Sequence, residues 1–271
     1  MKFTRDNITL YYDDQGPSEP ADARSTILCI HGYPLGRKMW RPQLTGLCAQ
    51  YRILAPDLRG FGDSDPAPGP YPMDLLADDC AALLDHLQIG DPVTVCGLSM
   101  GGYIAFAFSR RYPQRLRGLI LAATRAQPDS ADAAANRLKA AALAEKEGPE
   151  AIARAMLPKM LSAATQASNP ETVSKVKAIM QEASVPGIVG ALMGMRERPD
   201  STPTLPTIQV PTLILRGDDD PFASREEAEA MCEAIPHAQL ICIPNAAHLP
   251  NLEQPERFNQ AVLAWMQQNI H

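Results

Sequence analysis

Short apolar runs recur along the chain, and segments with helical periodicity separate them. The runs occupy residues 27–30, 52–55, 93–96, 119–122, 212–215 and 240–243. Continuous apolar runs are typical of strands that are covered on both faces, as in parallel sheets. Between the runs, apolar residues recur at a spacing of about 3.6 residues, most clearly over residues 73–87. Strands that alternate with helices predict an α/β fold with a mostly parallel sheet.

The alternation stops between residues 125 and 198, where no strand-like run occurs. Four prolines are expected to divide this alanine-rich stretch into short helices: Pro149, Pro158, Pro170 and Pro186. The stretch therefore predicts a helical insertion between two strands, followed by a return loop over residues 198–206. Near the two ends of the chain, residues 8–12 are expected to form one strand of an antiparallel pair, and Pro255 is expected to begin the last helix.

The composition limits the classes of protein and partner. The chain has 271 residues, 45% of them hydrophobic and 21% charged, and a net charge of −6. This balance is typical of a soluble globular protein with one or two domains. The densest basic stretch, residues 110–117, is expected to be a solvated helix end and loop, so no nucleic-acid partner is predicted. The longest apolar stretch, residues 93–108, is too short and too rich in glycine for a membrane span.

The cysteines and the first residues of the chain bear on the cellular compartment in which the protein is expected. No two of the six cysteines are spaced as in zinc-binding or redox motifs. Those that lie in apolar runs are expected to be reduced and to act as small hydrophobic residues. The first residues lack the apolar segment of a signal peptide. We therefore expect a cytoplasmic protein without a metal site.

The strongest chemical signal is Gly97-Leu98-Ser99-Met100-Gly101, which lies between a strand-like run and a helix-like segment that ends at Pro113. Gly-x-Ser-x-Gly in this context is the pattern of a nucleophile elbow, a strained turn that exposes the serine hydroxyl at the carboxyl end of a sheet. The two glycines lack a Cβ that would collide with the neighbouring strand and helix. The sequence therefore predicts that Ser99 is a nucleophile. The alternative is a turn of small residues that only packs a helix on a strand.

A serine nucleophile needs a base that takes its proton. His248 is the candidate because it follows the run at 240–243 by a short loop, and so lies at the same edge of the sheet as Ser99. His86 is expected on the polar side of a helix, His237 at the opposite edge of the sheet, and His271 is the terminus.

The base in turn needs an acid that orients it. Asp218, Asp219 and Asp220 follow the run at 212–215 and are the candidates. The order nucleophile, acid, histidine differs from the chain orders of the chymotrypsin and subtilisin types.

A tetrahedral intermediate also needs hydrogen-bond donors for its oxyanion. His31-Gly32-Tyr33-Pro34 ends the first core strand. We expect the backbone N–H groups of Tyr33 and Met100 to supply the two bonds. His31 is expected to form hydrogen bonds within its own loop.

Three further features have structural as well as functional interpretations. Asp57 and Arg59 are expected to pair locally within the loop at 57–64. Arg125 and Arg196 flank the helical insertion; each is either a surface residue or a cation that binds an anionic substrate. The methionines of the insertion are expected to pack its core or to line an apolar pocket over the nucleophile; they are Met156, Met160, Met180, Met193 and Met195.

Taken together, these motifs resemble the α/β-hydrolase superfamily over nearly the whole chain. The resemblance rests on His-Gly-Tyr-Pro, Asp-Leu-Arg-Gly-Phe-Gly-Asp-Ser, Gly-Leu-Ser-Met-Gly-Gly and His-Leu-Pro-Asn-Leu-Glu-Gln-Pro-Glu, in the family's order. Within the superfamily, the chain resembles small cytosolic carboxylesterases and the related 3-oxoadipate enol-lactone hydrolases. The resemblance implies an α/β-hydrolase fold: a mostly parallel eight-stranded sheet with helices on both faces and a helical cap inserted after the sixth strand. Residues 1–124 and 199–271 would form the core, and residues 125–198 the cap.

The resemblance also bears on the site. The family's acid often stands three residues after the glycine of a Gly-x-x-Asp turn, which favours Asp220 over Asp219 and Asp218. This chain has Ala247 where the family usually has a glycine before its histidine. Ser99 at the elbow excludes the epoxide hydrolases and dehalogenases of this fold, which use aspartate there.

We therefore expect a serine hydrolase that cleaves short- to medium-chain carboxylic esters through an acyl-enzyme intermediate. Its partner would be a small-molecule ester, and it would need no cofactor or metal. A lactone hydrolase, a C–C bond hydrolase and a perhydrolase would use the same triad. A ligand-binding receptor on the same fold is the alternative from another class. The sequence leaves the natural substrate and the oligomeric state open.

Overall fold

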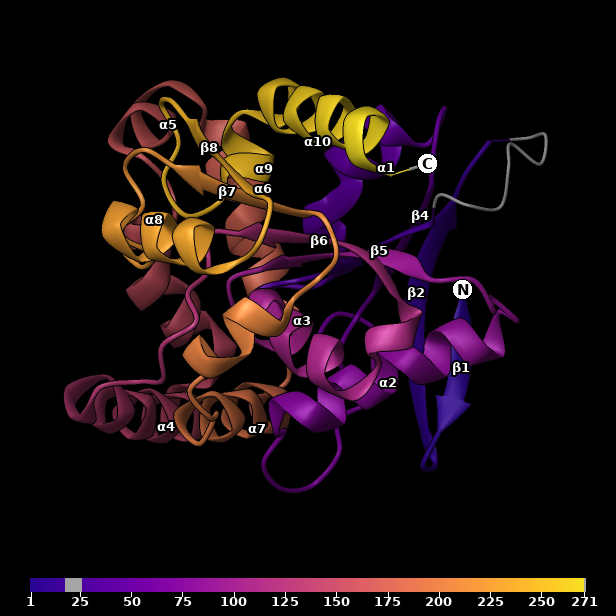
Figure 1. Cartoon of the computed structure of the whole chain (residues 1–271). Helices are drawn as coiled ribbons and strands as arrows, with labels where there is room; N and C mark the ends of the chain where they lie inside the picture. Colours follow the sequence, from indigo (N-terminus) through magenta and orange to yellow (C-terminus); the bar gives the residue numbers. More distant parts are fainter. Residues whose placement is uncertain (18–25, 271) are drawn as a thin grey trace.

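The computed structural model describes residues 1–17 and 26–270. One eight-stranded sheet runs through the molecule in the order β1-β2-β4-β3-β5-β6-β7-β8 (Figure 1). The strands are β1 (Lys2–Arg5), β2 (Ile8–Gln15), β3 (Thr26–Ile30), β4 (Arg52–Pro56), β5 (Val93–Leu98), β6 (Leu116–Ala122), β7 (Thr212–Gly217) and β8 (Ala238–Ile243). β2 is antiparallel to both β1 and β4, and the neighbours from β4 through β8 are parallel. The α/β-hydrolase fold with a mostly parallel sheet is therefore confirmed.

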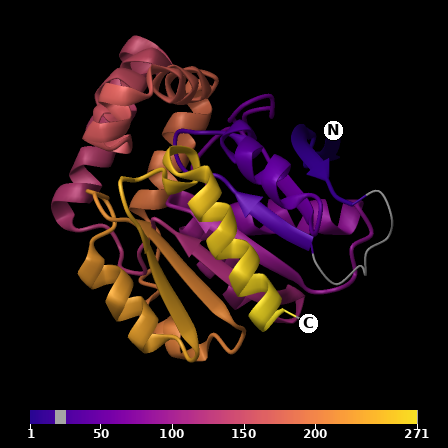
Figure 2. The same cartoon turned by 90° about the horizontal axis from the view of Figure 1, so that it is seen from above.

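Helices cover both faces of this sheet (Figure 2). Those on one face are α2 (Met73–His86), α3 (Met100–Arg111) and α8 (Arg225–Ala234), and those on the other are α1 (Arg41–Leu47) and α10 (Pro255–Asn269). β3 shows how the two faces divide one strand between two cores. Leu28 and Ile30 pack with the first set of helices, and Ile27 and Cys29 pack with the second. A strand buried on both faces is apolar at every position, which explains the continuous runs.

The last run follows this rule only in part. β8 is the edge strand of the sheet, and Leu240, Ile241 and Cys242 in it are only half-buried. Its side chains pack against both cores, Leu240 on one face and Ile241 on the other, but they are less completely covered than those of the inner strands. The reason is that an edge strand has a neighbouring strand on one side only, so its side chains keep part of their contact with water.

Between β6 and β7 the chain forms a separate group of helices, which Figures 1 and 2 show at one side of the molecule. They are α4 (Ala131–Met160), α5 (Ala163–Ser168), α6 (Pro170–Gln181) and α7 (Val185–Arg196). Gly148, with φ at 76°, breaks α4 just before Pro149. The expectation that each proline divides the stretch is wrong at Pro158, which lies inside α4. Pro158 stands two residues before the end of α4, so the helix ends shortly after this proline and not at it.

Within residues 1–17 and 26–270, no single helix is long and apolar enough to cross a membrane. Only α6 and α7 taken together reach that length in this part of the chain, with a bend of 91° between them.

Candidate active site

The site lies where the strand order reverses. β3 and β5 are neighbours in the sheet, and the strand after β3 lies on one side of this pair while the strands after β5 lie on the other. A reversal of strand order of this kind leaves a crevice at the carboxyl ends of the strands. β3 ends next to His31, β5 ends next to Ser99, and β7 and β8 lead into the loops that carry Asp220 and His248. The parallel strands thus bring four distant segments to one edge.

Ser99 stands on a sharp turn between β5 and α3. Its φ of 55° and ψ of −112° place it in a region that non-glycine residues rarely adopt. The turn is held by hydrogen bonds from Ser99 N–H to the Ala122 carbonyl at 2.9 Å and from the Thr124 hydroxyl to the Ser99 carbonyl at 2.8 Å. A Cβ at Gly97 would overlap the Gly101 carbonyl. The glycine therefore allows the close approach that the strained serine needs.

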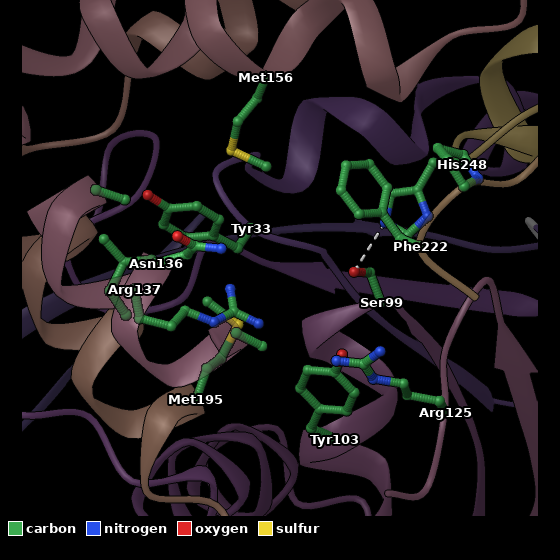
Figure 3. A pocket seen from close by; sticks show the side chains of 14 residues that line it. Tyr33, Ser99, Tyr103, Arg125, Asn136, Arg137, Met156, Met195, Phe222 and His248 are labelled. Atoms are coloured by element: carbon green, nitrogen blue, oxygen red, sulfur yellow. Dashed lines mark hydrogen bonds between the residues drawn. The ribbon is translucent and has the colours of Figure 1, made fainter. Parts of the chain in front are cut away.

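Three side chains form a continuous chain of contacts (Figure 3 shows the contact of Ser99 with His248). His248 Nε2 lies 2.9 Å from Ser99 Oγ. His248 Nδ1 lies 3.0 Å from each carboxylate oxygen of Asp220. His248 is 3% exposed and Asp220 7%, whereas Ser99 is half-buried, so only the hydroxyl end of the chain opens towards a ligand.

The acidic loop presents only one of its three carboxylates to His248. Asp218 and Asp219 are exposed, while Asp220 is buried and accepts a further hydrogen bond from Phe222 N–H at 2.8 Å. Burial raises the pKa of Asp220, but the attraction of His248 and the hydrogen bonds that the carboxylate accepts outweigh it, so the pKa lies below its ordinary value. Asp220 is thus an anion where it meets the imidazole.

The turn that carries His248 accommodates alanine where a glycine was expected. Ala247 does not adopt a positive φ, so its Cβ causes no strain there. The turn packs directly on Gly217, where a Cβ would overlap the Ala247 carbonyl. The departure from the family pattern at this position therefore leaves the contacts of His248 intact.

Tyr33 and Met100 stand in the two turns that lie next to Ser99. A Cβ added at Gly32 would come within 3.3 Å of Ser99 Cβ, so the turn before Tyr33 lies against Ser99. Met100 is the first residue of α3. The N-terminal N–H groups of a helix carry a partial positive charge, which suits an anion at this point.

The other histidines that the structure describes do not take part in these contacts. His31 Nδ1 pairs with the Gly32 carbonyl at 2.9 Å, and Nε2 accepts from Leu58 N–H at 3.0 Å, so it joins two loops beside the site. Burial lowers the pKa of His31 to about 4. His86 stacks on Phe3, and His271 lies outside the described residues.

The expected pair of Asp57 and Arg59 is wrong. Asp57 pairs with Arg37, both through its side chain and through a 2.6 Å hydrogen bond from Arg37 N–H. Arg59 binds both oxygens of Asp79 at 2.7 Å. Each partner stands twenty positions away in the chain, so a local interpretation of the loop had no means of finding it.

Glu253 is a buried residue of the site region to which the sequence analysis assigned no role. It lies in the short helix α9 (Pro250–Glu253), and one carboxylate oxygen accepts from Ala247 N–H at 2.7 Å. The other accepts from Ser162 N–H, also at 2.7 Å. One carboxylate therefore joins the turn before His248 to the start of α5. Its signal in the sequence was its place in the motif His-Leu-Pro-Asn-Leu-Glu-Gln-Pro-Glu, five positions after the histidine.

A cavity of about 370 Å³ opens above Ser99 (Figure 3). Phe222 contacts His248 edge-on on one side of it, at 4.7 Å between ring centroids. Of the methionines expected there, Met156 and Met195 line the cavity, whereas Met160 and Met180 are buried in the core. Its remaining wall comes from the start of α4 and from side chains beside the elbow.

Of the two arginines that flank the insertion, Arg125 lines the cavity and Arg196 does not. Arg196 is exposed next to Glu197. Arg137, on α4, also lines the cavity, although the sequence analysis did not single it out. Among the described residues, no group of three or more His, Cys, Asp or Glu side chains is placed to hold a metal ion.

Comparison with known proteins agrees with this geometry. The profile of the Alpha/beta hydrolase family matches residues 27–261. The chain belongs to this family. The hydrolase is 31% identical to 3-oxoadipate enol-lactonase 2 of Acinetobacter baylyi, over 97% of this chain and 95% of that protein.

Two solved structures show the same likeness in three dimensions. A thermophilic esterase from Thermogutta terrifontis, solved with malate bound, has a TM-score of 0.93 and 44% identity, over 97% of this chain and 95% of its own. The enol-lactonase of Burkholderia xenovorans LB400 has a TM-score of 0.90 and 27% identity, over 98% of this chain and all of its own (100%). The likeness therefore covers both the sheet and the helices inserted between β6 and β7.

Proposed function

We propose that this hydrolase cleaves short- to medium-chain carboxylic esters through a covalent intermediate on Ser99. The observation that supports this most directly is the contact of 2.9 Å between Ser99 Oγ and His248 Nε2, continued by Asp220 at 3.0 Å from Nδ1. This is the arrangement in which a histidine activates a serine and a carboxylate holds the histidine in the required tautomer.

In the first half of the reaction, Ser99 Oγ attacks the ester carbonyl carbon while His248 Nε2 takes the hydroxyl proton. The negative charge that forms on the carbonyl oxygen accepts hydrogen bonds from the N–H groups of Tyr33 and Met100. Asp220 stabilises the imidazolium. When the C–O bond to the alcohol breaks, His248 donates the proton to the leaving oxygen, and the acyl group stays on Ser99.

In the second half, water replaces the alcohol. His248 takes a proton from the water, whose oxygen attacks the acyl carbon, and the same two N–H groups bind the second oxyanion. His248 then returns the proton to Ser99 Oγ as the carboxylic acid leaves. Each group ends in its starting state, and the two steps require neither a metal nor a cofactor.

We further propose that residues 1–124 and 199–271 act as the core and residues 125–198 as a cap over the nucleophile. Cap side chains such as Met156, Met195 and Asn136 line the cavity above Ser99. A cap in this position excludes water from the acyl group and determines the size of substrate that enters.

The test is the hydrolysis of p-nitrophenyl esters from acetate to laurate. Ser99→Ala is expected to abolish turnover, and Asp220→Asn to lower kcat by about 10⁴, as removal of the orienting acid does in other triads. Asp219→Asn is the matched control, because this neighbouring carboxylate is exposed. Turnover that survives in Ser99→Ala, or equal loss in the two aspartate variants, would overturn the proposed roles.

The second candidate is a lactone hydrolase. It is favoured by the two enol-lactonases that resemble the chain over nearly its whole length. The chemistry is the same, except that the alcohol remains attached to the acyl group after ring opening. Turnover of lactones without turnover of open-chain esters would support it. If neither esters nor lactones are turned over, substrates of C–C bond hydrolases and of perhydrolases are tested next. Labelling of Ser99 without steady-state turnover of any of these compounds would indicate a ligand-binding protein.

A further inference from the structure

The cavity above Ser99 has a positive wall. Arg125 and Arg137 both line it, and in Figure 3 their guanidinium groups point into the space that Ser99 and His248 face. Among the described residues, no Asp or Glu side chain lines the cavity. Charged side chains seldom line a cavity of this kind without a ligand or a buried partner to stabilise them.

The two arginines share one buried carboxylate with a third. The fully buried side chain of Asp129 accepts from Arg137 Nε at 3.0 Å, from Arg198 Nη1 at 2.7 Å and from Arg125 Nη2 at 3.3 Å. Glu227 lies 3.6 Å from Arg125 Nη1. These three arginines and two carboxylates leave one positive charge in excess.

The cluster is rigid as well as positive. Arg198 is held by Asp129 and by the Met195 carbonyl, and it stacks on the ring of Tyr103 at 4.0 Å. Arg137 donates a hydrogen bond from Nε to Asp129, and its two terminal guanidinium nitrogens point into the cavity (Figure 3). A guanidinium fixed in this way binds a carboxylate without first having to be ordered.

Two polar atoms beside the cavity lack a partner. The Tyr33 hydroxyl belongs to a side chain that is 4% exposed, and it forms no hydrogen bond with the described residues. Arg125 Nε is also buried without a partner among the described residues. A buried donor without an acceptor is costly, and such groups require an explanation in a native structure. An acceptor that arrives with the ligand would supply one.

We propose that the cavity binds a substrate that carries one free carboxylate, held by Arg137 and Arg125 with a hydrogen bond from the Tyr33 hydroxyl. The proposal rests on the proposed function, since the same molecule must present its ester to Ser99. The chemical class is the half-ester of a short dicarboxylic acid. The excess charge is one, so a single carboxylate balances it. Because the arginines are about three-quarters shielded from solvent, water screens this attraction only in part.

The test uses two substrates that differ only in charge. Monomethyl glutarate and methyl pentanoate have the same chain, with a carboxylate in the first where the second has a methyl group. Methanol release by the unaltered protein gives kcat/KM for each. We expect the ratio of the two values to favour the half-ester by at least about tenfold, the effect of one charged hydrogen bond.

The variants Arg137→Met and Arg125→Met remove the charge and keep most of the side chain. Each is expected to lower the ratio at least about tenfold, mainly through a higher KM for the half-ester. Arg137→Lys keeps a cation and is expected to restore part of the ratio. Arg196→Met is the matched control, because this arginine of the same insertion lies outside the cavity. If Arg137→Met does not fold, the ratios measured for Arg125→Met and Arg137→Lys decide whether the arginines bind the carboxylate.

The outcomes separate this proposal from the proposed function. Hydrolysis of both esters with a ratio near one, or a ratio that the arginine variants leave unchanged, overturns the carboxylate site and leaves the esterase intact. If neither ester is hydrolysed, the proposed function fails, and calorimetric titration of the Ser99→Ala protein with glutarate decides the site. Binding that Arg137→Met weakens supports it, and no binding overturns it.

Discussion

Replacing Glu253 by glutamine tests the contact that joins the helices inserted between β6 and β7 to the turn before His248. Its two carboxylate oxygens accept bonds of 2.7 Å from Ser162 N–H and Ala247 N–H, and the residue is 8% exposed. Glutamine has one acceptor oxygen, and its amide nitrogen would face an N–H donor. One buried backbone N–H therefore loses its acceptor, while the shape of the side chain barely changes.

The magnitude follows from these contacts. A hydrogen bond to a charged group contributes about 1.5–3 kcal/mol, and a buried donor left without an acceptor costs about 1–3 kcal/mol. We expect the free energy of unfolding to fall by about 3 kcal/mol, which lowers Tm by about 6–12 °C in a chain of this size. Because Ala247 directly precedes His248, a looser turn misplaces His248, the proposed base, and kcat should fall at least about tenfold.

Thermal unfolding and ester hydrolysis measure the two effects on the same preparation. Glu256→Gln is the control, since this residue stands three positions further on, is exposed, and lies in the first turn of α10. If Glu253→Gln melts within about 2 °C of the control and turns over at the same rate, the carboxylate does not hold the turn, and the reasoning is refuted.

Two further predictions concern the elbow and its neighbouring loop. Gly101→Ala places a Cβ against the Ile30 carbonyl, so we expect a loss of at least about 2 kcal/mol in thermal unfolding; an unchanged Tm would show that α3 has room to shift. The pKa of His31 is lowered by burial to about 4 from 6.5, so the unfolded chain binds the proton first. Stability is then complete above about pH 6.5 and falls by up to about 3 kcal/mol towards pH 4. Urea unfolding at about pH 7 and pH 4.5 should show a smaller decline in His31→Gln, and equal declines would contradict the assignment.

The sequence by itself determined the class of fold and the sharp turn at Ser99. Apolar runs reveal buried strands because every side chain of such a strand faces protein, and helical periodicity reveals which face of a helix packs. The turn at Ser99 could be predicted because a strained turn between a strand and a helix tolerates few residue types. The glycines and the serine that it requires lie within five consecutive residues, 97–101. The position of His248 could also be predicted, since it follows a strand and therefore lies at the same edge of the sheet as Ser99.

Other features depended on tertiary structure. The residues alone left three neighbouring aspartates as candidates for the acid that orients His248. The folding of their loop buries Asp220 and exposes the other two. Arg137 lines the cavity only because α4 crosses above Ser99, and no local pattern distinguishes it from the exposed Arg196. The exposure of β8 likewise followed from its place at the edge of the sheet.

The physical reason is the range over which each constraint acts. Periodicity, turn geometry and helix ends are enforced by residues within a few positions, so the sequence displays them directly. Ion pairs and shared buried carboxylates join segments far apart: Glu253 contacts Ser162, ninety-one positions earlier, and Arg198 contacts Asp129 across sixty-nine. Such pairs form when packing removes both groups from water, and only the folded chain decides which groups those are.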